Sequence, residues 1–213
     1  MNPEDIAKIL LEINAVTLKT DPPFTWVSGI KSPIYCDNRL ILSFQEKRKQ
    51  IVDAYLEVID SKNLQCDIIA GVATGAIAWG ALIAVKLDKP FIYVRSKAKE
   101  HGKTNQIEGR LEKGQKVLVI EDLVSTGGSS FSAVESVREA GGIVDDCLAI
   151  FTYEFAKAKK KFEEGKCNLY TLSSITPLIK VAKDTQFIDE QDAEVIADFF
   201  TNPPGWGKKH GFE

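Results

Sequence analysis

The spacing of the apolar residues changes along this chain, from helical periods in the first 61 residues to an alternation of strands and helices after residue 66. Residues 3–18 repeat apolar side chains at helical spacing, which predicts one amphipathic helix. The apolar stripe of this helix consists of Ile6, Ile9, Leu10, Ile13 and Val16. Residues 43–61 predict a second helix, because Ser43 and Glu46 stand at the spacing of a capping box. From residue 66 onward, short apolar runs alternate with helical segments, as in a protein built on a parallel sheet.

The predicted strands of that sheet are residues 66–72, 91–94, 117–120, 143–152 and 169–172. Helices are expected between and after them: up to about residue 87, from about 131 to 140, over 155–165, then over 174–183 and 188–200. The expected fold class is α/β, an open, mainly parallel twisted sheet flanked by helices. No repeat or linker divides the chain, so a single domain is expected over residues 1–213. Its α/β core would span residues 41–200, followed by a Pro/Gly-rich tail over 201–213.

Residues 21–39 follow neither a helical nor a regular strand period. They contain Pro22, Pro23, Gly29 and Pro33, with β-prone pieces at 24–27 and 34–36. This pattern predicts a small irregular hood outside the main sheet, so that residues 1–40 comprise the first helix and the hood.

Composition narrows the classes of protein to consider. Hydrophobic residues make up 44% of the 213 residues and charged residues 27%, which suits a protein with a sizeable core. The net charge of −3 argues against a nucleic-acid partner, and no apolar run is long enough for a membrane span. The N-terminus lacks the pattern of a secretion signal. Four scattered cysteines without metal-type spacing indicate core residues in a reducing, cytoplasmic setting: Cys36, Cys66, Cys147 and Cys167.

The most informative stretch is residues 117–130, where a strand, two acids, small residues and a helix follow one another. The four apolar residues 117–120 predict a strand buried on both faces. Small Ser, Thr and Gly residues before a helix N-terminus can bind phosphate through hydroxyls and free N–H groups. The acids Glu121 and Asp122 would repel phosphate, but they suit sugar hydroxyls or a substrate-bound metal. A sugar 5-phosphate suits both the acid pair and the small-residue turn. The alternative is an ordinary α/β turn in which the acids are only solvated.

A second candidate site is the cationic loop, which we define as residues 95–103. It holds Arg95, Lys97, Lys99, His101 and Lys103 within nine residues. In an arbitrary chain such a run would be a solvated surface. After a strand of a phosphate-binding α/β protein, it is suited to closing over a pyrophosphate.

These stretches resemble known sequences. Residues 117–130 resemble the 5-phosphoribosyl-1-pyrophosphate (PRPP) signature of the type I phosphoribosyltransferases. The order Arg, Lys, His-Gly in the cationic loop is similar to the catalytic loop of the orotate phosphoribosyltransferase family. The hood motif Gly29-x-x-Ser32-Pro33-x-Tyr35 and the loop Gly71–Ile77 complete a resemblance that covers most of residues 1–175.

The resemblance implies site residues, position by position. Those implied to act in catalysis are Arg95, Lys99, His101 and Asp122. Those implied to bind PRPP are Arg95, Lys97, Lys99, His101, Glu121, Asp122, Leu123, Val124, Ser125, Thr126, Gly127, Gly128 and Ser129. Those implied to contact orotate are Lys31, Ile34, Tyr35 and Ser125. No residue is implied to bind metal directly, because Mg²⁺ is expected to arrive on PRPP, held mainly by substrate oxygens.

The chain also departs from the pattern of some relatives. It has Val27 where they have a Lys, Ser96 where they have a second basic residue, and no Arg near Thr152 and Tyr153. Lys97 is expected to replace the missing loop charge. Backbone N–H groups around Ile34 and Tyr35 are expected to hold the carboxylate of orotate.

The resemblance implies conversion of orotate and PRPP to orotidine 5′-phosphate and pyrophosphate, in pyrimidine biosynthesis. It also implies a symmetric homodimer in which the loop of one subunit covers the active site of the other. Two alternatives stay open: a purine phosphoribosyltransferase, and a PRPP-sensing regulator on the same fold. The Ser32–Tyr35 motif speaks against the first, and the retained cationic loop speaks against the second.

Overall fold

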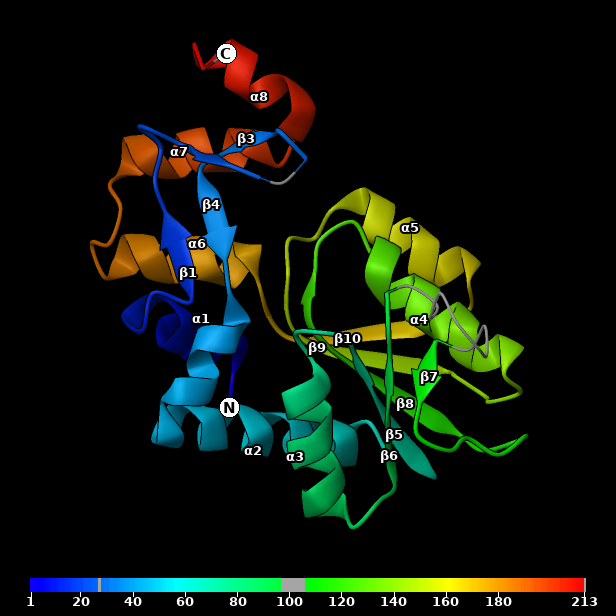
Figure 1. The fold of residues 1–213 in the computed structure, drawn as a ribbon. Coiled ribbons are helices and arrows are strands. Elements are labelled where there is room, and N and C mark those ends of the chain that lie inside the picture. Colours follow the sequence, from blue (N-terminus) through cyan, green and yellow to red (C-terminus); the bar gives the residue numbers. More distant parts are fainter. Residues whose placement is uncertain (27, 97–105, 213) are drawn as a thin grey trace.

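The computed structural model describes residues 1–26, 28–96 and 106–212. Its centre is a six-stranded sheet in the order β10-β9-β8-β5-β6-β7, parallel except for the edge strand β7 (Figure 1). The strands are β5 Ile68–Val72, β6 Phe91–Val94, β7 Ile107–Glu108, β8 Val117–Val124, β9 Asp146–Thr152 and β10 Asn168–Ser174. The expected α/β class with a mainly parallel sheet is therefore confirmed.

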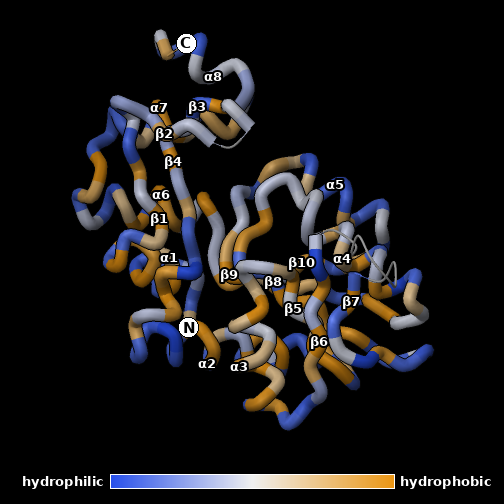
Figure 2. Tube along the Cα trace, in the orientation of Figure 1, coloured by the Kyte–Doolittle hydropathy of each residue, from blue (hydrophilic) through white to orange (hydrophobic). Residues whose placement is uncertain are grey.

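Helices cover both faces of this sheet (Figure 1). On one face lie α2 Gln45–Ser61 and α3 Ile77–Leu87, and on the other lie α4 Gly128–Glu139 and α5 Ala156–Glu164. Because both faces are covered, all five residues of β5 and the first five of β8 are buried. The hydrophobic residues gather along these strands, whereas many of the connecting turns are hydrophilic (Figure 2).

The hood forms two small antiparallel sheets outside the main one, as expected. The strand β1 Val16–Leu18 pairs with β4 Ile34–Cys36, and β2 Phe24–Thr25 pairs with β3 Lys31–Ser32. The 3-10 helix η1 Asn38–Ser43 then leads into α2. Beside the hood lie α1 Pro3–Glu12, α6 Ile175–Asp184, α7 Glu190–Phe199 and α8 Pro203–Lys209 (Figure 1).

Four sequence predictions need correction, the first at the N-terminus. The helix predicted over residues 3–18 ends at Glu12. Asn14 then adopts φ 55°, a left-handed conformation that Asn tolerates better than most residues and that ends the helix. Val16 reaches the core from β1 instead, which explains why it matched the apolar stripe.

The predicted capping box at Ser43 is also wrong. Ser43 ends η1, so the N-cap of α2 is Phe44, which makes no side-chain cap hydrogen bond.

The third correction concerns β8 and its helix. The strand runs for eight residues to Val124, so the acid pair lies inside it rather than after it. Pairing with β9 holds it in register, with Glu121 opposite Ala149 and Val124 opposite Thr152. The helix α4 begins at Gly128, three residues before the predicted start at Phe131.

The fourth correction is the C-terminal tail, which contains the short helix α8. Trp206 is 1% exposed, and its indole Nε1–H donates to the carbonyl of Val195 at 3.0 Å. His210 lies 2.8 Å from the Asp198 carboxylate and beside the Trp206 ring. The tail is therefore part of the folded structure.

An aromatic cluster connects the tail to the hood. The ring of Trp26 stacks on Tyr153 at 5.6 Å and meets Phe199 edge-on at 5.5 Å. Phe199 in turn meets Trp206 edge-on at 5.8 Å. Trp26 is therefore partly buried and packs against the core.

We predict that Trp206→Ala lowers the free energy of unfolding by about 3–5 kcal/mol, because it removes a fully buried indole and leaves a cavity. Urea unfolding of both proteins measures the difference. The matched control is Phe187→Ala, whose side chain is 47% exposed and whose loss should change stability by less than about 1 kcal/mol. Equal effects of the two substitutions would show that α8 does not stabilise the fold.

Candidate active site

A cavity of about 490 Å³ lies at the carboxyl ends of β5 and β8, between the sheet and the hood. Ligands of open α/β sheets bind at this edge. Its lining residues are Cys36, Asp37, Arg39, Val72, Ala73, Thr74, Gly75, Glu121, Asp122, Leu123, Ser125, Thr126, Gly127, Gly128 and Ser129. A larger hollow of about 600 Å³ lies between α5 and β10, but it is lined by neither the acid pair nor the glycine turn. We therefore take the smaller cavity, which contains the acids and the glycines, as the candidate active site.

One wall of the cavity is the phosphate loop, which we define as residues 125–129. Gly127 has φ 73° and lies against α5, where a Cβ would come within 3.3 Å of Ala158. Glycine is needed there for both conformation and space. The first turn of α4 follows with no side-chain cap, so its N–H groups and partial positive charge face an incoming anion. Such an arrangement is suited to binding a phosphate group.

The two acids of β8 have different environments. Glu121 is 4% exposed and accepts hydrogen bonds from the hydroxyl of Ser130 at 2.8 Å and the N–H of Asp122 at 3.0 Å. Burial, and then the neighbouring charge of Asp122, raise the pKa of Glu121 well above its usual value. Asp122 is half-buried. Asp122 therefore offers the more accessible carboxylate. Glu121 has a structural role, because its hydrogen bond with Ser130 joins β8 to α4.

Gly75 brings the neighbouring turn close to Asp122. A Cβ at Gly75 would lie 2.2 Å from Oδ2 of Asp122, so any side chain there would displace the Asp122 carboxylate. The residues after β5 and the acid of β8 thus share one crevice.

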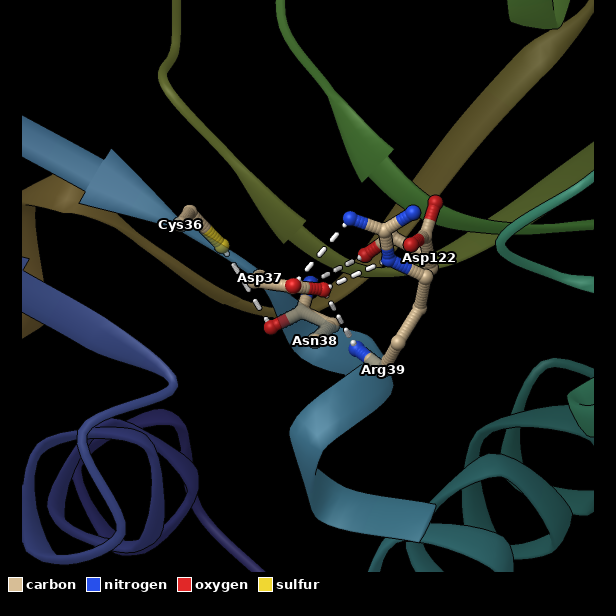
Figure 3. A network of polar contacts seen from close by, with 5 residues as sticks. All are labelled: Cys36, Asp37, Asn38, Arg39 and Asp122. Carbon is tan, nitrogen blue, oxygen red and sulfur yellow. Dashed lines mark hydrogen bonds and ion pairs between the residues drawn. The ribbon is translucent and has the colours of Figure 1, made fainter.

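The opposite wall comes from the end of β4 and the start of η1 (Figure 3). Asn38 is 1% exposed, and its Nδ2 donates to the backbone carbonyl of Asp122 at 2.6 Å. Arg39 forms a two-point pair with Asp37 through Nε at 2.6 Å and Nη2 at 3.1 Å. This contact lowers the pKa of Asp37. Sequence reasoning did not select these three residues, although the polar run after a β-prone segment was a visible signal.

The residues predicted to contact orotate do not all meet at this cavity. Ser125 lines it. Ile34 is fully buried, and its N–H already donates a hydrogen bond to Ser32 Oγ at 3.2 Å. Tyr35 is 45% exposed, and Lys31 Nζ donates to Thr25 Oγ1 at 3.1 Å. None of these three hood residues is among the described residues that line the cavity.

The residues predicted to bind PRPP also do not all line the cavity. Lys97, Lys99 and His101 lie outside the described residues. Arg95 follows β6 beside a small hollow that Ser129 of the phosphate loop also lines, and its Nη1 lies 3.4 Å from Glu108. In β8, Leu123 lines the main cavity and Val124 is fully buried.

Within residues 1–26, 28–96 and 106–212, no three His, Cys, Asp or Glu side chains gather as a metal site. The half-buried Asp122 carboxylate offers the oxygen that Mg²⁺ prefers, so the cavity fits an ion whose other oxygens come from a substrate and water. No helix of the described ranges is long and apolar enough to cross a membrane.

We predict that Glu121→Gln changes how stability depends on pH. A carboxyl group whose pKa is raised in the folded state binds more protons there than in the unfolded chain, so stability falls as pH rises above about 4.5. The amide of Gln does not ionise, so the variant should lack this fall and gain stability relative to the wild type as pH rises. Urea unfolding between about pH 5 and 8 measures the difference.

The control is Glu112→Gln, whose carboxylate is 61% exposed and should leave the pH dependence nearly unchanged. If the free energy of unfolding of Glu121→Gln depends on pH as that of the wild type does, ionisation of Glu121 does not destabilise the folded state.

Comparison with known proteins identifies the family. Residues 42–168 match the model of the phosphoribosyl transferase domain. The chain is 49% identical over 202 residues to an orotate phosphoribosyltransferase of Coxiella burnetii, covering 95% of this chain and 97% of that one. It is 51% identical over 205 residues to one of Listeria monocytogenes, covering 96% and 98%.

A solved structure adds the same indication. The crystal structure of orotate phosphoribosyltransferase from Aeropyrum pernix is similar with a TM-score of 0.75 and 28% identity, covering 86% of this chain and 99% of that one. The phosphate loop, acid pair and hood described above are thus found in a chain that is alike over nearly its whole length to these enzymes. This chain belongs to the phosphoribosyltransferase family and, within it, to the orotate phosphoribosyltransferases.

Proposed function

We propose that this chain transfers the 5-phosphoribosyl group of PRPP to N1 of orotate, giving orotidine 5′-phosphate and pyrophosphate in pyrimidine biosynthesis. The observation that carries the proposal is one cavity that joins a phosphate loop to a half-buried carboxylate. This combination suits a sugar phosphate. Family membership at about 50% identity over nearly the full chain supports orotate as the acceptor.

The two walls of the cavity divide the binding of PRPP. The N–H groups and hydroxyls of the phosphate loop bind the 5-phosphate. The Asp122 carboxylate accepts hydrogen bonds from the ribose hydroxyls. Glu121 keeps β8 and α4 together through Ser130, which fixes the distance between the two contacts.

In the reaction, a bond forms between N1 of orotate and C1 of the ribose, and the bond from C1 to the pyrophosphate oxygen breaks. The proton of N1 is released to the departing pyrophosphate or to water. Positive charge develops on the ribose and negative charge on the leaving group. The negative charge of Asp122 favours the positive ribose, and cations must stabilise the negative pyrophosphate. Arg95, Lys97, Lys99 and His101 are the residues we assign to the pyrophosphate, each worth about 10²–10³-fold in rate if it acts like other oxyanion donors.

Mg²⁺ is part of the proposal as a companion of PRPP. It would neutralise charge on the pyrophosphate oxygens. On the protein, Asp122 is the residue we assign to face it. The cationic loop would then exclude water while the bond is exchanged.

Two other features of the proposal are the compartment and the oligomer. The four cysteines are free, in keeping with a reducing cytoplasm. A two-fold homodimer is the commonest oligomer, and a loop as polar as residues 95–103 can cover a neighbouring subunit as readily as its own.

Turnover with different acceptors tests the activity. We expect the protein with PRPP and Mg²⁺ to consume orotate and to leave adenine, guanine and hypoxanthine unused. Asp122→Asn should weaken PRPP use and leave the melting temperature nearly unchanged, because the carboxylate faces the ligand crevice. Consumption of a purine would instead favour a purine phosphoribosyltransferase, and no turnover with intact PRPP binding would favour a PRPP-sensing regulator.

Mixing two inactive variants tests the shared active site. Lys99→Ala should lower kcat by about 10²-fold or more, as loss of a cation at the leaving group does. After subunit exchange with Asp122→Asn, half of the dimers are mixed and one site of each is intact. Activity should therefore recover towards about one quarter of that of the wild type. Exchange confirmed by mass without recovery would show that each loop serves its own subunit.

A further inference from the structure

The active-site cavity contains one positively charged residue within the described part of the chain. Its lining includes the acids Asp37, Glu121 and Asp122, and Arg39 is the single Lys or Arg among them. Apart from the N–H groups of the phosphate loop, Arg39 is therefore the one described positive group of the lining that an anionic substrate can meet. No role was assigned to this residue from the sequence.

Arg39 is held in one orientation before any substrate binds (Figure 3). Nε and Nη2 donate to the two carboxylate oxygens of Asp37 at 2.6 and 3.1 Å. Its backbone N–H also donates to Asp37 Oδ1, at 3.2 Å. The side chain is nonetheless 57% exposed, and Nη1 has no hydrogen-bond partner in the described ranges. Such a preorganised, open guanidinium loses little conformational freedom when it binds a further anion.

The wall that carries Arg39 is tied to the strand that carries the acids. Asn38, its neighbour, donates to the backbone carbonyl of Asp122 at 2.6 Å. Tyr55 from α2 donates to the carbonyl of Glu121 at 2.7 Å. The hydrogen bond of Asn38 thus holds the wall that carries Arg39 against β8.

Three anionic groups meet in the proposed reaction: the 5-phosphate, the pyrophosphate and the carboxylate of orotate. The 5-phosphate is taken by the phosphate loop. In a displacement at C1, the incoming base and the leaving pyrophosphate lie on opposite faces of the ribose. Arg95 lies with Ser129 at the end of β6, and Arg39 lies on the wall formed by β4 and η1. If Arg95 is on the side of the leaving group, Arg39 is on the side of the base.

Among the described residues, no other position predicted to hold the base places a cation at the cavity. Tyr153 is 4% exposed and packs among Trp26, Phe151 and Phe155. The N–H of Ile34 is already in contact with Ser32 Oγ. Lys31 is paired with Thr25 and does not line the cavity.

We propose that Arg39 binds the carboxylate of orotate and thereby sets the preference of this enzyme for an acidic pyrimidine over a neutral one. Asp37 is the positioning residue that holds the guanidinium. The inference rests on the proposed function and deepens it, because it assigns a specificity-determining residue to the base side of the cavity.

The test replaces Arg39 by Gln and compares orotate with its carboxamide, which has the same ring without the negative charge. We measure kcat/KM for orotate, the KM for PRPP, and the inhibition constant of the carboxamide against orotate. Arg39→Gln should lower kcat/KM for orotate by about 10- to 100-fold, the size of one charge-assisted contact. The constant for the carboxamide and the KM for PRPP should change by less than about threefold.

Three further variants separate binding from side effects. Arg39→Lys should recover part of the loss, because it keeps the charge without the two-point geometry. The double variant Asp37→Asn with Arg39→Gln should stay defective, whereas recovery would mean that only the unpaired Asp37 charge had repelled orotate. Arg110→Gln removes an arginine that is 87% exposed and should leave every constant unchanged.

Several results would overturn the assignment. A loss shared equally by orotate and the carboxamide, or a rise in the KM for PRPP alone, would place Arg39 at the ribose or the pyrophosphate. An unchanged kcat/KM for orotate would remove Arg39 from recognition. A wild-type protein that consumes no orotate would overturn the proposed function itself, whereas an active wild type with an unaffected Arg39→Gln overturns the role of Arg39 alone.

Discussion

The structure depends on the continuation of β8 beyond its apolar run. Four buried apolar residues start the strand, and pairing with β9 carries it on through the acid pair to Val124. Placing a carboxylate inside a parallel sheet costs free energy unless hydrogen bonds satisfy it. Ser130 and the Asp122 N–H satisfy Glu121, and Ser130 belongs to the first turn of α4. This buried contact fixes the phosphate loop relative to the acids, and so fixes the geometry of the whole cavity.

The remaining wall is attached to the same strand. Asn38 and Tyr55 donate to the backbone carbonyls of Asp122 and Glu121, so the hood and α2 are both held by β8. The C-terminal helices support the hood from outside through Trp26, Phe199 and Trp206. The cavity is thus a meeting point of the hood side of the molecule with the ends of β5 and β8. Specificity for the base would then arise on the hood side, and phosphate binding on the α4 side.

The two acids of β8 are not equivalent, because they lie on opposite faces of the strand. Adjacent residues of a strand point to opposite faces, so neighbouring carboxylates meet different surroundings. Glu121 faces α4 and is buried, and Asp122 lies at Gly75, where a Cβ would meet its carboxylate. The same period of two gives one acid a structural role and leaves the other accessible to a ligand.

The sequence by itself determined the α/β class, the five parallel strands from residue 66 onward, the phosphate loop and the family. These features depend on residues that are neighbours in the chain, and local periods and motifs report them directly. It did not reveal the end of the first helix at Glu12, the helix α8, the burial of Glu121 or the place of Arg39 in the cavity. Tertiary structure decided these, because their partners are distant: Asn38 and Asp122 lie 84 positions apart, and such a contact leaves no period in the sequence.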